Sequence, residues 1–586
     1  MPLRFSRALL VLLAVVLPFE APLFRAGPLL ITTVELVLYA LLFAWGLGVV
    51  ADILLGRTTL KAAFRALRED LMVQAALAWC AVLLASALTA PSHRTEALKF
   101  ALRCLSGVLA FFAARSLARE PEVGRRVLLA LLAGAVLSAA TAVIDWLVPV
   151  SAPAWQVFRK GEFETLGLQR ASGVFAYPTI GAMYWEAIVP LFVVAPVLGA
   201  RPRTGQGVDR RAVLAVLASA LLIGAILASA TRSGLAGAAV ACGLLIVLSW
   251  RTEVRVSRMA GVVLCVLGGL SAVTLSATHF GSLLGHRLQW WQDENWFHAE
   301  YEPAEAPRVV QVGQRFEVAV GVRNTGSVSW PWAGDHPTRL SYHWERVEDD
   351  ASRSGASGAV PVGEFEGVRT TLPEDVPPGA TCRVSAVVRG PAAPGTYRLR
   401  WDLVQEGVTW FGEQGNPTPA QQVEVTAATE SALSMIAEAP LPAENQPPPS
   451  RAALWRAAVV LWRERPLLGI GPDNFRRRYE AVLSPGPAGL PYTDTRLHAN
   501  SMYFETLADL GLMGIAALVF IAVALARVLR AHHRAGRWAG LGFGVAAATF
   551  FVHGMLDYFL EFTPLFCLFW LLLGLAAATG SGPRSG

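Results

Sequence analysis

Residues 125–148 read RRVLLALLAGAVLSAATAVIDWLV, two arginines followed by an apolar run whose one charged residue is Asp145. An apolar run of about 20 residues is long enough to cross the hydrocarbon core of a bilayer as a helix. Runs of this kind recur along the chain, and many of them adjoin short basic loops. The pattern predicts an all-α polytopic membrane protein.

The composition of the whole chain agrees with this interpretation. Of its 586 residues, 54% are hydrophobic and 16% are charged, whereas soluble proteins average about 25% charged residues. The mean hydropathy is +0.44. The net charge of +6 does not indicate nucleic-acid binding, because the arginines stand in loops between apolar runs, where they orient a membrane protein. The composition disfavours a soluble globular enzyme.

We expect twelve membrane-spanning segments, and their flanking charges give their orientation. Every second loop is basic, as the positive-inside rule requires of cytoplasmic loops. This alternation places both termini in the cytoplasm and the long region 280–504 outside. The expected segments are residues 8–24, 29–50, 71–90, 100–117, 127–148, 181–200, 212–230, 234–250, 259–279, 505–526, 539–556 and 563–580.

The cysteines indicate neither a disulfide framework nor a metal site. Five of the six lie in apolar runs, and Cys382 lies in a polar region without an evident partner. No C-x-x-C or similar spacing occurs.

The region that follows the N-terminal membrane part (1–280) changes in character twice. Residues 281–304 are predicted to form an interfacial aromatic segment, because aromatic side chains follow directly on a span: Trp290, Trp291, Trp296 and Phe297. Residues 305–427 alternate between apolar and polar residues with Gly, Pro and Asn at the breaks, as in RFEVAVGVRNTG and TCRVSAVVRG. This alternation predicts a periplasmic β-sandwich.

NTGSVSWPW (324–332) and GTYRLRWDLVQEGVTWFGE (395–413) resemble the tryptophan-rich immunoglobulin-like modules. The resemblance covers only this insert and implies no particular function. Two interpretations stay open for its tryptophans, which either stack on sugars or fill the core and rim of the sandwich: Trp330, Trp332, Trp401 and Trp410.

The chain then returns to the membrane. A Pro-rich linker covers residues 428–450, and residues 451–504 hold a periplasmic amphipathic helix (451–471) and a loop with several polar residues. The helix has too many arginines to span, so we expect it on the outer membrane face. Residues 505–586 form the C-terminal membrane part.

A few charged residues at the outer ends of the spans are candidates for function, because charge at membrane depth is costly. Arg170 precedes the sixth span, Arg232 stands in the short turn between spans seven and eight, and Arg103 lies near the start of span four. None has an acidic partner close in sequence. Each either reaches lipid headgroups or, with the others, binds an anion such as a phosphate.

A polar cluster before span ten adds a titratable group. PLLGIGPDNFRRRYE (466–480) contains Asn474, and TRLHANSMYFETLADLGLMG (495–514) contains the others. His498 stands a few residues before span ten, at its outer end and near other polar groups. We therefore expect it to titrate near neutrality and serve as a base. The further candidates for substrate binding are Asn474, Arg496, Asn500 and Glu505.

TRSGLAG, P-L-L-G-I-G-P-x-N-F and H-A-N-S-M-Y-F-E-T-L-A-D-L-G-L-M-G resemble the O-antigen ligase and polymerase (Wzy_C-type) superfamily. The expected twelve spans, the large outside loop and a late HGMLDYFLE segment (553–561) fit this resemblance. It implies a GT-C-like fold in a bacterial inner membrane. It also implies glycan transfer from undecaprenyl pyrophosphate, on the periplasmic side, without a metal or another cofactor. The implied acceptor is lipid A–core for a ligase, or another carrier-linked glycan for a polymerase.

The resemblance also implies roles for individual residues. Arg170 and Arg232 contact the pyrophosphate, and His498 activates the acceptor hydroxyl. Asn500 orients the acceptor or the histidine, although Ala499 separates two residues that are adjacent in many members. Arg496 is a further candidate, and Glu505 and Asp557 either pair with these groups or are structural.

Three other functions stay open at this point. A polymerase uses the same donor chemistry as a ligase. A transporter would carry its charged residues near the bilayer midplane, whereas here they gather at the outer ends of the spans. A non-catalytic envelope scaffold would bind sugar or protein through the sandwich.

Overall fold

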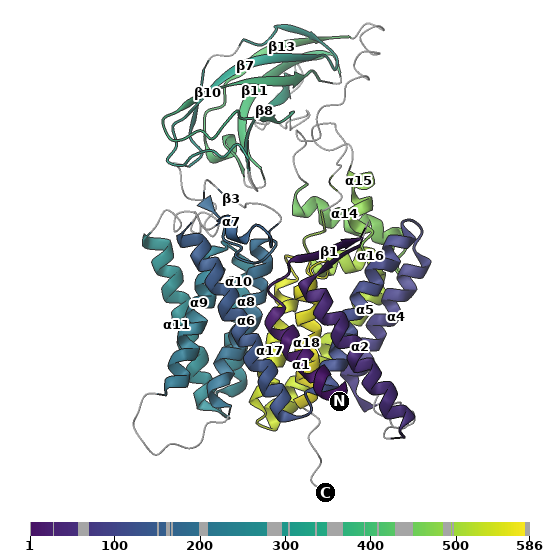
Figure 1. Ribbon diagram of the computed structural model, residues 1–586. Coiled ribbons are helices and arrows are strands. Elements are labelled where there is room, and N and C mark those ends of the chain that lie inside the picture. Colours follow the sequence, from purple (N-terminus) through teal and green to yellow (C-terminus); the bar gives the residue numbers. More distant parts are fainter. Residues whose placement is uncertain are drawn as a thin grey trace.

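The computed structural model combines a bundle of apolar helices with two β-sheets at one end of the bundle (Figure 1). It describes residues 2–26, 29–56, 69–148, 152–159, 164–165, 168–198, 209–277, 296–302, 305–333, 337–347, 367–391, 393–406, 409–427, 449–483, 494 and 497–579.

Among the described residues, twelve apolar helices form the bundle, and every one overlaps a predicted span. They are α1 (Pro2–Val16), α2 (Thr33–Leu54), α4 (Leu71–Thr89), α5 (Arg94–Leu117), α6 (Pro121–Leu147), α8 (Pro178–Val194), α9 (Arg210–Ala228), α10 (Arg232–Ser249), α11 (Val254–Ala277), α16 (Met502–Arg534), α17 (Trp538–His553) and α18 (Thr563–Thr579). Nine are long and apolar enough to cross a bilayer, while α1, α17 and α18 are shorter. The structure supports a multi-pass membrane protein, and the count of twelve spans stays a prediction.

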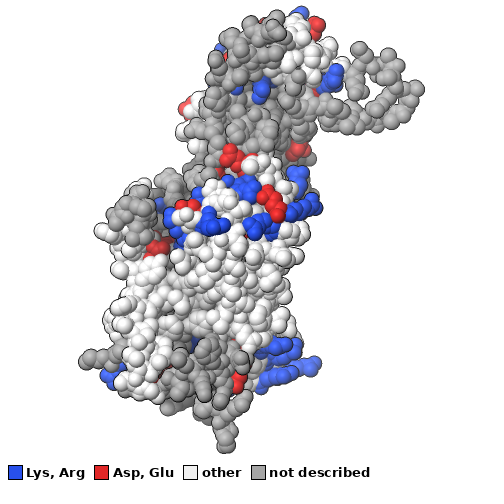
Figure 2. Space-filling model, turned by 90° about the vertical axis from the view of Figure 1, so that its right-hand side faces the viewer, with Lys and Arg blue, Asp and Glu red and all other residues white. Residues whose placement is uncertain are grey.

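Burial separates the inner helices of the bundle from the outer ones. In α8, 89% of the most apolar stretch is buried, against 22% in α2 and in α11. α8 packs against α6, α9, α10 and α17, so it is the central helix of its half of the bundle. On the face that Figure 2 shows, a broad uncharged belt covers the middle of the bundle, and Lys, Arg, Asp and Glu side chains gather at its two ends. Such a belt is typical of a surface that faces lipid.

Polar caps fix the helix ends at the side that we predicted to be cytoplasmic. Asp70 caps the start of α4 through the backbone N–H groups of Met72 and Val73. Its other carboxylate oxygen lies 2.6 Å from the guanidinium of Arg115, in the last turn of α5. The capped helix start and the paired arginine hold α4 and α5 together at this end.

Helix α16 contains a break that brings the PLLGIG segment (466–471) into the bundle. Gly511 has φ 64° and ψ −159°, which a residue with a side chain rarely adopts. The N–H groups freed at the break donate to Pro466 and Leu467, and Ile470 and Gly471 donate back to the carbonyls of Ala508 and Asp509. The two segments therefore pair through their backbones, and Gly511 serves this contact as well as helix packing.

In the described part of the insert, nine strands form two sheets. The three-stranded sheet has the order β10-β7-β5, and the larger one has the order β6-β13-β11-β8-β9 with β12 beside β11. Apolar side chains from both sheets meet in one core, because the strands alternate buried and exposed residues. The strands are β5 (Ala299–Tyr301), β6 (Val309–Gln311), β7 (Arg315–Asn324), β8 (Thr338–Arg346), β9 (Thr370–Thr371), β10 (Thr381–Arg389), β11 (Gly395–Gln405), β12 (Thr409–Trp410) and β13 (Ala420–Thr426).

The sheets correct one prediction and resolve another. Trp296 and Phe297 do not lie in an interfacial aromatic segment: they are buried in the core of the sheets, where β5 follows directly, while Trp290 and Trp291 lie outside the described residues. Of the four tryptophans with two open interpretations, three are buried, and only Trp332 is exposed. Burial of Trp330, Trp401 and Trp410 favours the core interpretation.

Short elements cover the bundle at the end nearest the sheets (Figure 1). They are β1 (Pro22–Ala26), β2 (Leu29–Thr32), α7 (Ala152–Trp155), β3 (Glu164–Thr165), β4 (Leu168–Gln169), α14 (Arg451–Glu464) and α15 (Phe475–Leu483). The expected amphipathic helix corresponds in position to α14, which ends at Glu464 rather than at 471. Its apolar side, including Leu454 and Leu461, packs in a core shared with α15 and α16.

Candidate active site

His498 lies directly before α16, and a carboxylate contacts each nitrogen of its ring. Nδ1 lies 2.5 Å from Oε1 of Glu505, in the first turn of α16. Nε2 lies 3.0 Å from Oε2 of Glu561, in the segment between α17 and α18. The second oxygen of Glu505 accepts the backbone N–H of Ala499 at 2.6 Å. Glu505 is fully buried, whereas the side chain of Glu561 is 27% exposed.

This environment corrects the expectation that His498 titrates near neutrality. Burial alone would lower its pKa, but the charges and hydrogen bonds of Glu505 and Glu561 outweigh burial and raise the pKa from 6.5 to about 10. The ring of Tyr558 also stacks on the imidazole, with 4.8 Å between ring centroids. At neutral pH His498 is therefore an imidazolium, which cannot accept a proton.

Residues 466–480, which include the start of α15, lie next to the His498 cluster and bind to Asp509 of α16. The carboxylate of Asp509 accepts the backbone N–H groups of Asp473 and Phe475 at 2.7 and 2.8 Å. Asp473 binds Arg476 through two bonds of 2.6 Å. These bonds, with the charges of Glu561 and Glu505, raise the pKa of Arg476. Arg476 thus adds a positive charge close to the His498 cluster, and the prediction from sequence did not include it.

Asn474 has a different position from the one that we expected. Its side chain is fully buried, and its amide nitrogen donates to the carbonyl oxygens of Ser92 and Ile470, both at 2.9 Å. These bonds tie the loop before α5 to the PLLGIG segment. The geometry therefore gives Asn474 a supporting position, and its role in substrate binding stays a prediction.

Arg170 and Arg232 meet at the turn between α9 and α10. Nε of Arg170 donates to the carbonyl of Ser229 at 3.0 Å, and another of its nitrogens lies 3.5 Å from the hydroxyl of Thr231. Arg232 is the exposed first residue of α10. The segment that carries Arg170 is anchored in turn, because Arg159 pairs with the buried Asp145 at the end of α6 and donates to Gly173. The structure thus brings the two arginines to one turn.

A second histidine, His553, lies close to this turn at the end of α17. Nδ1 lies 3.0 Å from Oε1 of Glu186, in the middle of α8. Nε2 lies 3.1 Å from the carboxylate of Asp557 and 3.1 Å from the hydroxyl of Ser233, the neighbour of Arg232. His553 therefore repeats the arrangement of His498, with a carboxylate on each ring nitrogen.

The segment between α17 and α18 joins the two histidine clusters. It begins after His553, carries Asp557 and Tyr558, and reaches Glu561, which contacts His498. Further along, the hydroxyl of Thr563 accepts a 2.6 Å bond from Arg103 of α5. Arg103, Arg232 and His498 thus lie at the same end of the bundle, connected through one short stretch of chain.

Three remaining predictions concern the loop before α16. Glu505 contacts Nδ1 of His498, and its role in substrate binding stays a prediction. Asn500 is half-buried and has φ 49° at the entry to α16. Arg496 lies outside the described residues.

Sequence reasoning did not find Glu186, His553 or Glu561 as site residues. A signal existed for Glu186, because a carboxylate inside an apolar span is costly and needs a partner. The HGMLDYFLE segment contains the other two residues, but nothing in the sequence shows which histidine Glu561 contacts.

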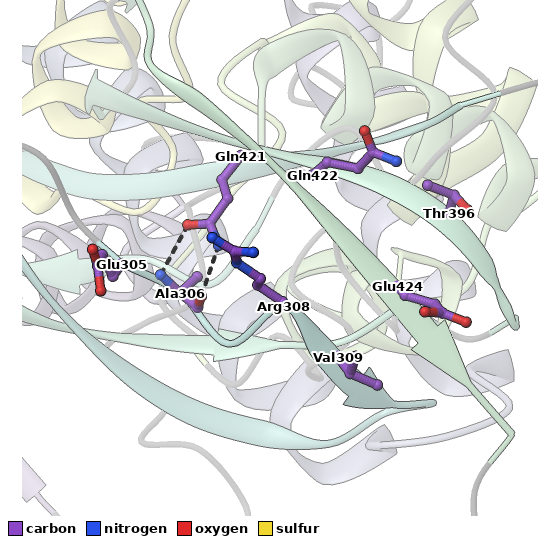
Figure 3. Close-up of a pocket in the computed structure, with 8 residues that line it drawn as sticks. All are labelled: Glu305, Ala306, Arg308, Val309, Thr396, Gln421, Gln422 and Glu424. Carbon is purple, nitrogen blue, oxygen red and sulfur yellow. Dashed lines mark hydrogen bonds between the residues drawn. The ribbon is translucent and has the colours of Figure 1, made fainter.

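A groove on the larger sheet is lined by Glu305, Ala306, Arg308, Val309, Thr396, Gln421, Gln422 and Glu424. In it the amide of Gln421 is already bonded to the backbone of Ala306 (Figure 3). Among the residues that the structure describes, no group of three or more His, Cys, Asp or Glu side chains has the geometry of a metal site.

The helices and the ion-paired histidines define a multi-pass membrane protein with a charged site at one end of its bundle. Residues 424–519 match the family model Wzy_C, described as O-antigen ligase. This range contains α14, α15, His498, Glu505 and the break in α16. The match confirms the predicted resemblance to the O-antigen ligase and polymerase superfamily and supports a function of that general type.

The other comparisons add no argument. No curated protein matches the chain. Among solved structures, a match was found to "Pseudomonas fluorescens alkylpurine DNA glycosylase AlkC bound to DNA containing an abasic site analog". The identity is 12%, the match covers 57% of this chain and 82% of that chain, and the TM-score is 0.16. A TM-score this low is evidence for neither fold nor function.

Proposed function

We propose that the protein is an O-antigen ligase-like glycosyltransferase. It moves a glycan from undecaprenyl pyrophosphate to lipid A–core, or to a similar acceptor, at the periplasmic face of a bacterial inner membrane. The observation that carries the proposal is the His498–Glu505–Glu561 cluster, because His498 and Glu505 lie in the segment that matches the O-antigen ligase model. The arginines at the same end of the bundle supply the charge that a diphosphate donor needs.

Arg170 and Arg232 are assigned to the donor. A guanidinium group offers two parallel N–H donors that fit phosphate oxygens. When the bond between the anomeric carbon and the diphosphate oxygen breaks, the electron pair leaves with the diphosphate. Arg170 contacts the turn that carries Arg232, and together the two arginines stabilise this developing charge. Preorganised electrostatic stabilisation of this kind is often the largest contribution to catalysis.

The acceptor is assigned to the Glu561–His498 pair. Because His498 holds its proton at neutral pH, we assign the proton-accepting role to Glu561, whose carboxylate is partly exposed. The acceptor oxygen forms a bond to the anomeric carbon as its proton passes to Glu561. Glu505 holds Nδ1 of His498, so Nε2 stays beside the carboxylate of Glu561. Direct attack of this kind inverts the anomeric centre.

The test is glycan transfer by the purified protein in lipid nanodiscs. The donor is an undecaprenyl-pyrophosphate-linked glycan, and the acceptor is either lipid A–core or a second carrier-linked glycan. Transfer to lipid A–core supports the ligase. Growth of the carrier-linked glycan alone shows a polymerase instead, and no transfer to either acceptor contradicts the proposal.

A pair of variants tests the role of Glu561. Glu561→Gln removes the proton acceptor, and losses of general acid–base catalysis are typically about 10²–10⁴-fold. Glu464→Gln is the matched control: Glu464 forms an exposed ion pair with Arg478, and such pairs contribute little. If both variants transfer glycan at the same rate as the unmodified protein, Glu561 has no catalytic role.

A further inference from the structure

The His553 cluster (His553, Glu186, Asp557 and Ser233) has no role in the proposed reaction. Burying its ionisable groups costs folding free energy. Glu186 and His553 have side chains with no exposed surface, and Glu186 lies within a helix that is long and apolar enough to span a membrane. Ionisable groups at such depth are expensive and usually have a functional partner. The cluster links α8, α10 and α17 through Glu186, Ser233 and His553.

The R-S-G-L-A-G motif at the start of α10 is built around this cluster. Ser233 contacts His553, and Gly237 leaves room for the carboxylate of Glu186. A Cβ atom at position 237 would lie 2.4 Å from Oε2 of Glu186, which is closer than real Cβ contacts allow. The same motif carries Arg232, so the residue assigned to the donor is the chain neighbour of Ser233, which contacts His553.

The His553 cluster is also connected to the segment that carries Glu561, the residue assigned to the acceptor. Asp557 contacts His553 on the same nitrogen as Ser233. The backbone N–H of Met502, at the start of α16, donates to the carbonyls of Gly554 and Asp557 at 2.8 and 3.0 Å. The segment after His553 is thereby fixed to α16 just before it reaches Glu561. His553 therefore stands between the element that carries Arg232 and the segment that carries Glu561.

We propose that Glu186, His553 and Ser233 are positioning residues that set the placement of Arg232 relative to Glu561. The inference rests on the proposed function, because it assigns Arg232 to the donor and Glu561 to the acceptor. These positioning residues do not touch the reacting atoms. They hold the start of α10 against the segment between α17 and α18, and a small misplacement of reacting groups costs about 10²-fold in rate.

Two alanine substitutions in one helix test the proposal. Gly237→Ala pushes the Glu186 carboxylate away from its place beside His553. Gly243→Ala is the matched control, because a Cβ atom at position 243 meets nothing within 4 Å. Both changes replace a helical glycine by the same residue. We expect kcat for glycan transfer to fall about tenfold or more in Gly237→Ala, with a smaller change in KM for the donor, and to stay unchanged in Gly243→Ala.

A purely structural role predicts a different result. It lowers the melting temperature and the yield of folded Gly237→Ala, but leaves kcat for each folded molecule unchanged, and that outcome overturns the proposal. If Gly237→Ala does not fold, Ser233→Ala replaces it, since it removes only the hydroxyl that contacts His553. A wild-type kcat in Ser233→Ala then also overturns the proposal.

The same assay separates this inference from the proposed function. If the unmodified protein and Gly243→Ala both transfer glycan while Gly237→Ala equals them in kcat, the positioning role is wrong and the function stands. If the unmodified protein transfers no glycan to either acceptor, the proposed function fails, and the positioning role fails with it.

Discussion

At the scale of single residues, the site depends on two histidines that are each held between two carboxylates. Glu505 and Glu561 contact His498, and Glu186 and Asp557 contact His553. A carboxylate on each nitrogen favours the charged imidazolium. The imidazolium in turn fixes the direction of both carboxylates. At neutral pH His498 therefore helps to position the carboxylates of Glu505 and Glu561.

The raised pKa of His498 predicts how stability depends on pH. A group whose pKa is higher in the folded state stabilises that state fully below its unfolded pKa, and this contribution is lost as pH rises to the folded pKa. For His498 the loss should run from about pH 6.5 to about pH 10. We expect the advantage in melting temperature of the unmodified protein over His498→Gln to shrink across this range. Thermal unfolding in nanodiscs at several pH values measures it, and an advantage that grows with pH contradicts the assignment.

The sequence predicted part of this site. The choice of His498 and the placement of Arg170 and Arg232 at the outer ends of the spans followed from the sequence around the spans, whereas the pairing of Glu505 was left open. The contacts of His553 did not, because Glu186, Ser233 and His553 are separated by long stretches of chain and meet only through the packing of α8, α10 and α17. The pKa of His498 also depends on Glu561, which is 63 positions further along the chain.

At the scale of secondary-structure elements, the break in α16 connects the PLLGIG segment to the site. Glu505 and Asp509 lie before the break, where Glu505 holds His498 and Asp509 holds the start of α15. The sequence predicted a membrane-spanning helix here (505–526), but not the backbone pairing with residues 466–471. That pairing depends on a positive φ, and a helical pattern of apolar residues does not reveal it.

Alanine substitutions at two glycines with positive φ distinguish the effect of backbone strain from the effect of a close contact. Gly511→Ala forces a side chain into an unfavourable φ and places its Cβ 2.6 Å from the carbonyl of Leu467. Gly536→Ala carries a similar φ of 60°, but its Cβ meets nothing within 4 Å. We expect Gly511→Ala to lower the melting temperature and reduce transfer by about tenfold or more, and Gly536→Ala to lose only about 1–2 kcal/mol of stability. Equal effects in the two variants would show that the pairing with Leu467 has no role.

At the scale of the whole molecule, the apolar belt divides the charges into two groups (Figure 2). The basic loops between the helices gave the predicted topology. Helices α14 and α15 lie at the end of the bundle nearest the sheets (Figure 1), and α16 contacts both the start of α15 and His498. The predicted spans all fall on helices, because length and hydropathy alone determine them. The sandwich boundary was less accurate, because a tryptophan in a core and a tryptophan at an interface look alike in sequence.

The orientation in the membrane is testable with two single cysteines. Arg451→Cys lies at the start of α14, and Arg119→Cys lies between α5 and α6 at the other end of the bundle. Both positions are exposed. We expect a membrane-impermeant maleimide to label Arg451→Cys from the periplasm, above the background of the native cysteines, and to label Arg119→Cys only after the inner membrane is opened. The reverse pattern would place the site in the cytoplasm.

The central claim is that Arg170 and Arg232 hold the diphosphate of the lipid-linked donor close to the His498 cluster. The most direct test is photo-crosslinking of the purified protein with an undecaprenyl diphosphate analogue that carries a photoreactive group at the diphosphate end, followed by peptide mapping. We predict that the label falls on residues 168–177, 229–237 or 497–505, that undecaprenyl pyrophosphate competes for it, and that Arg232→Ala weakens it. Label on residues 527–537 at the opposite end of the bundle, or on the sheets alone, would contradict the claim.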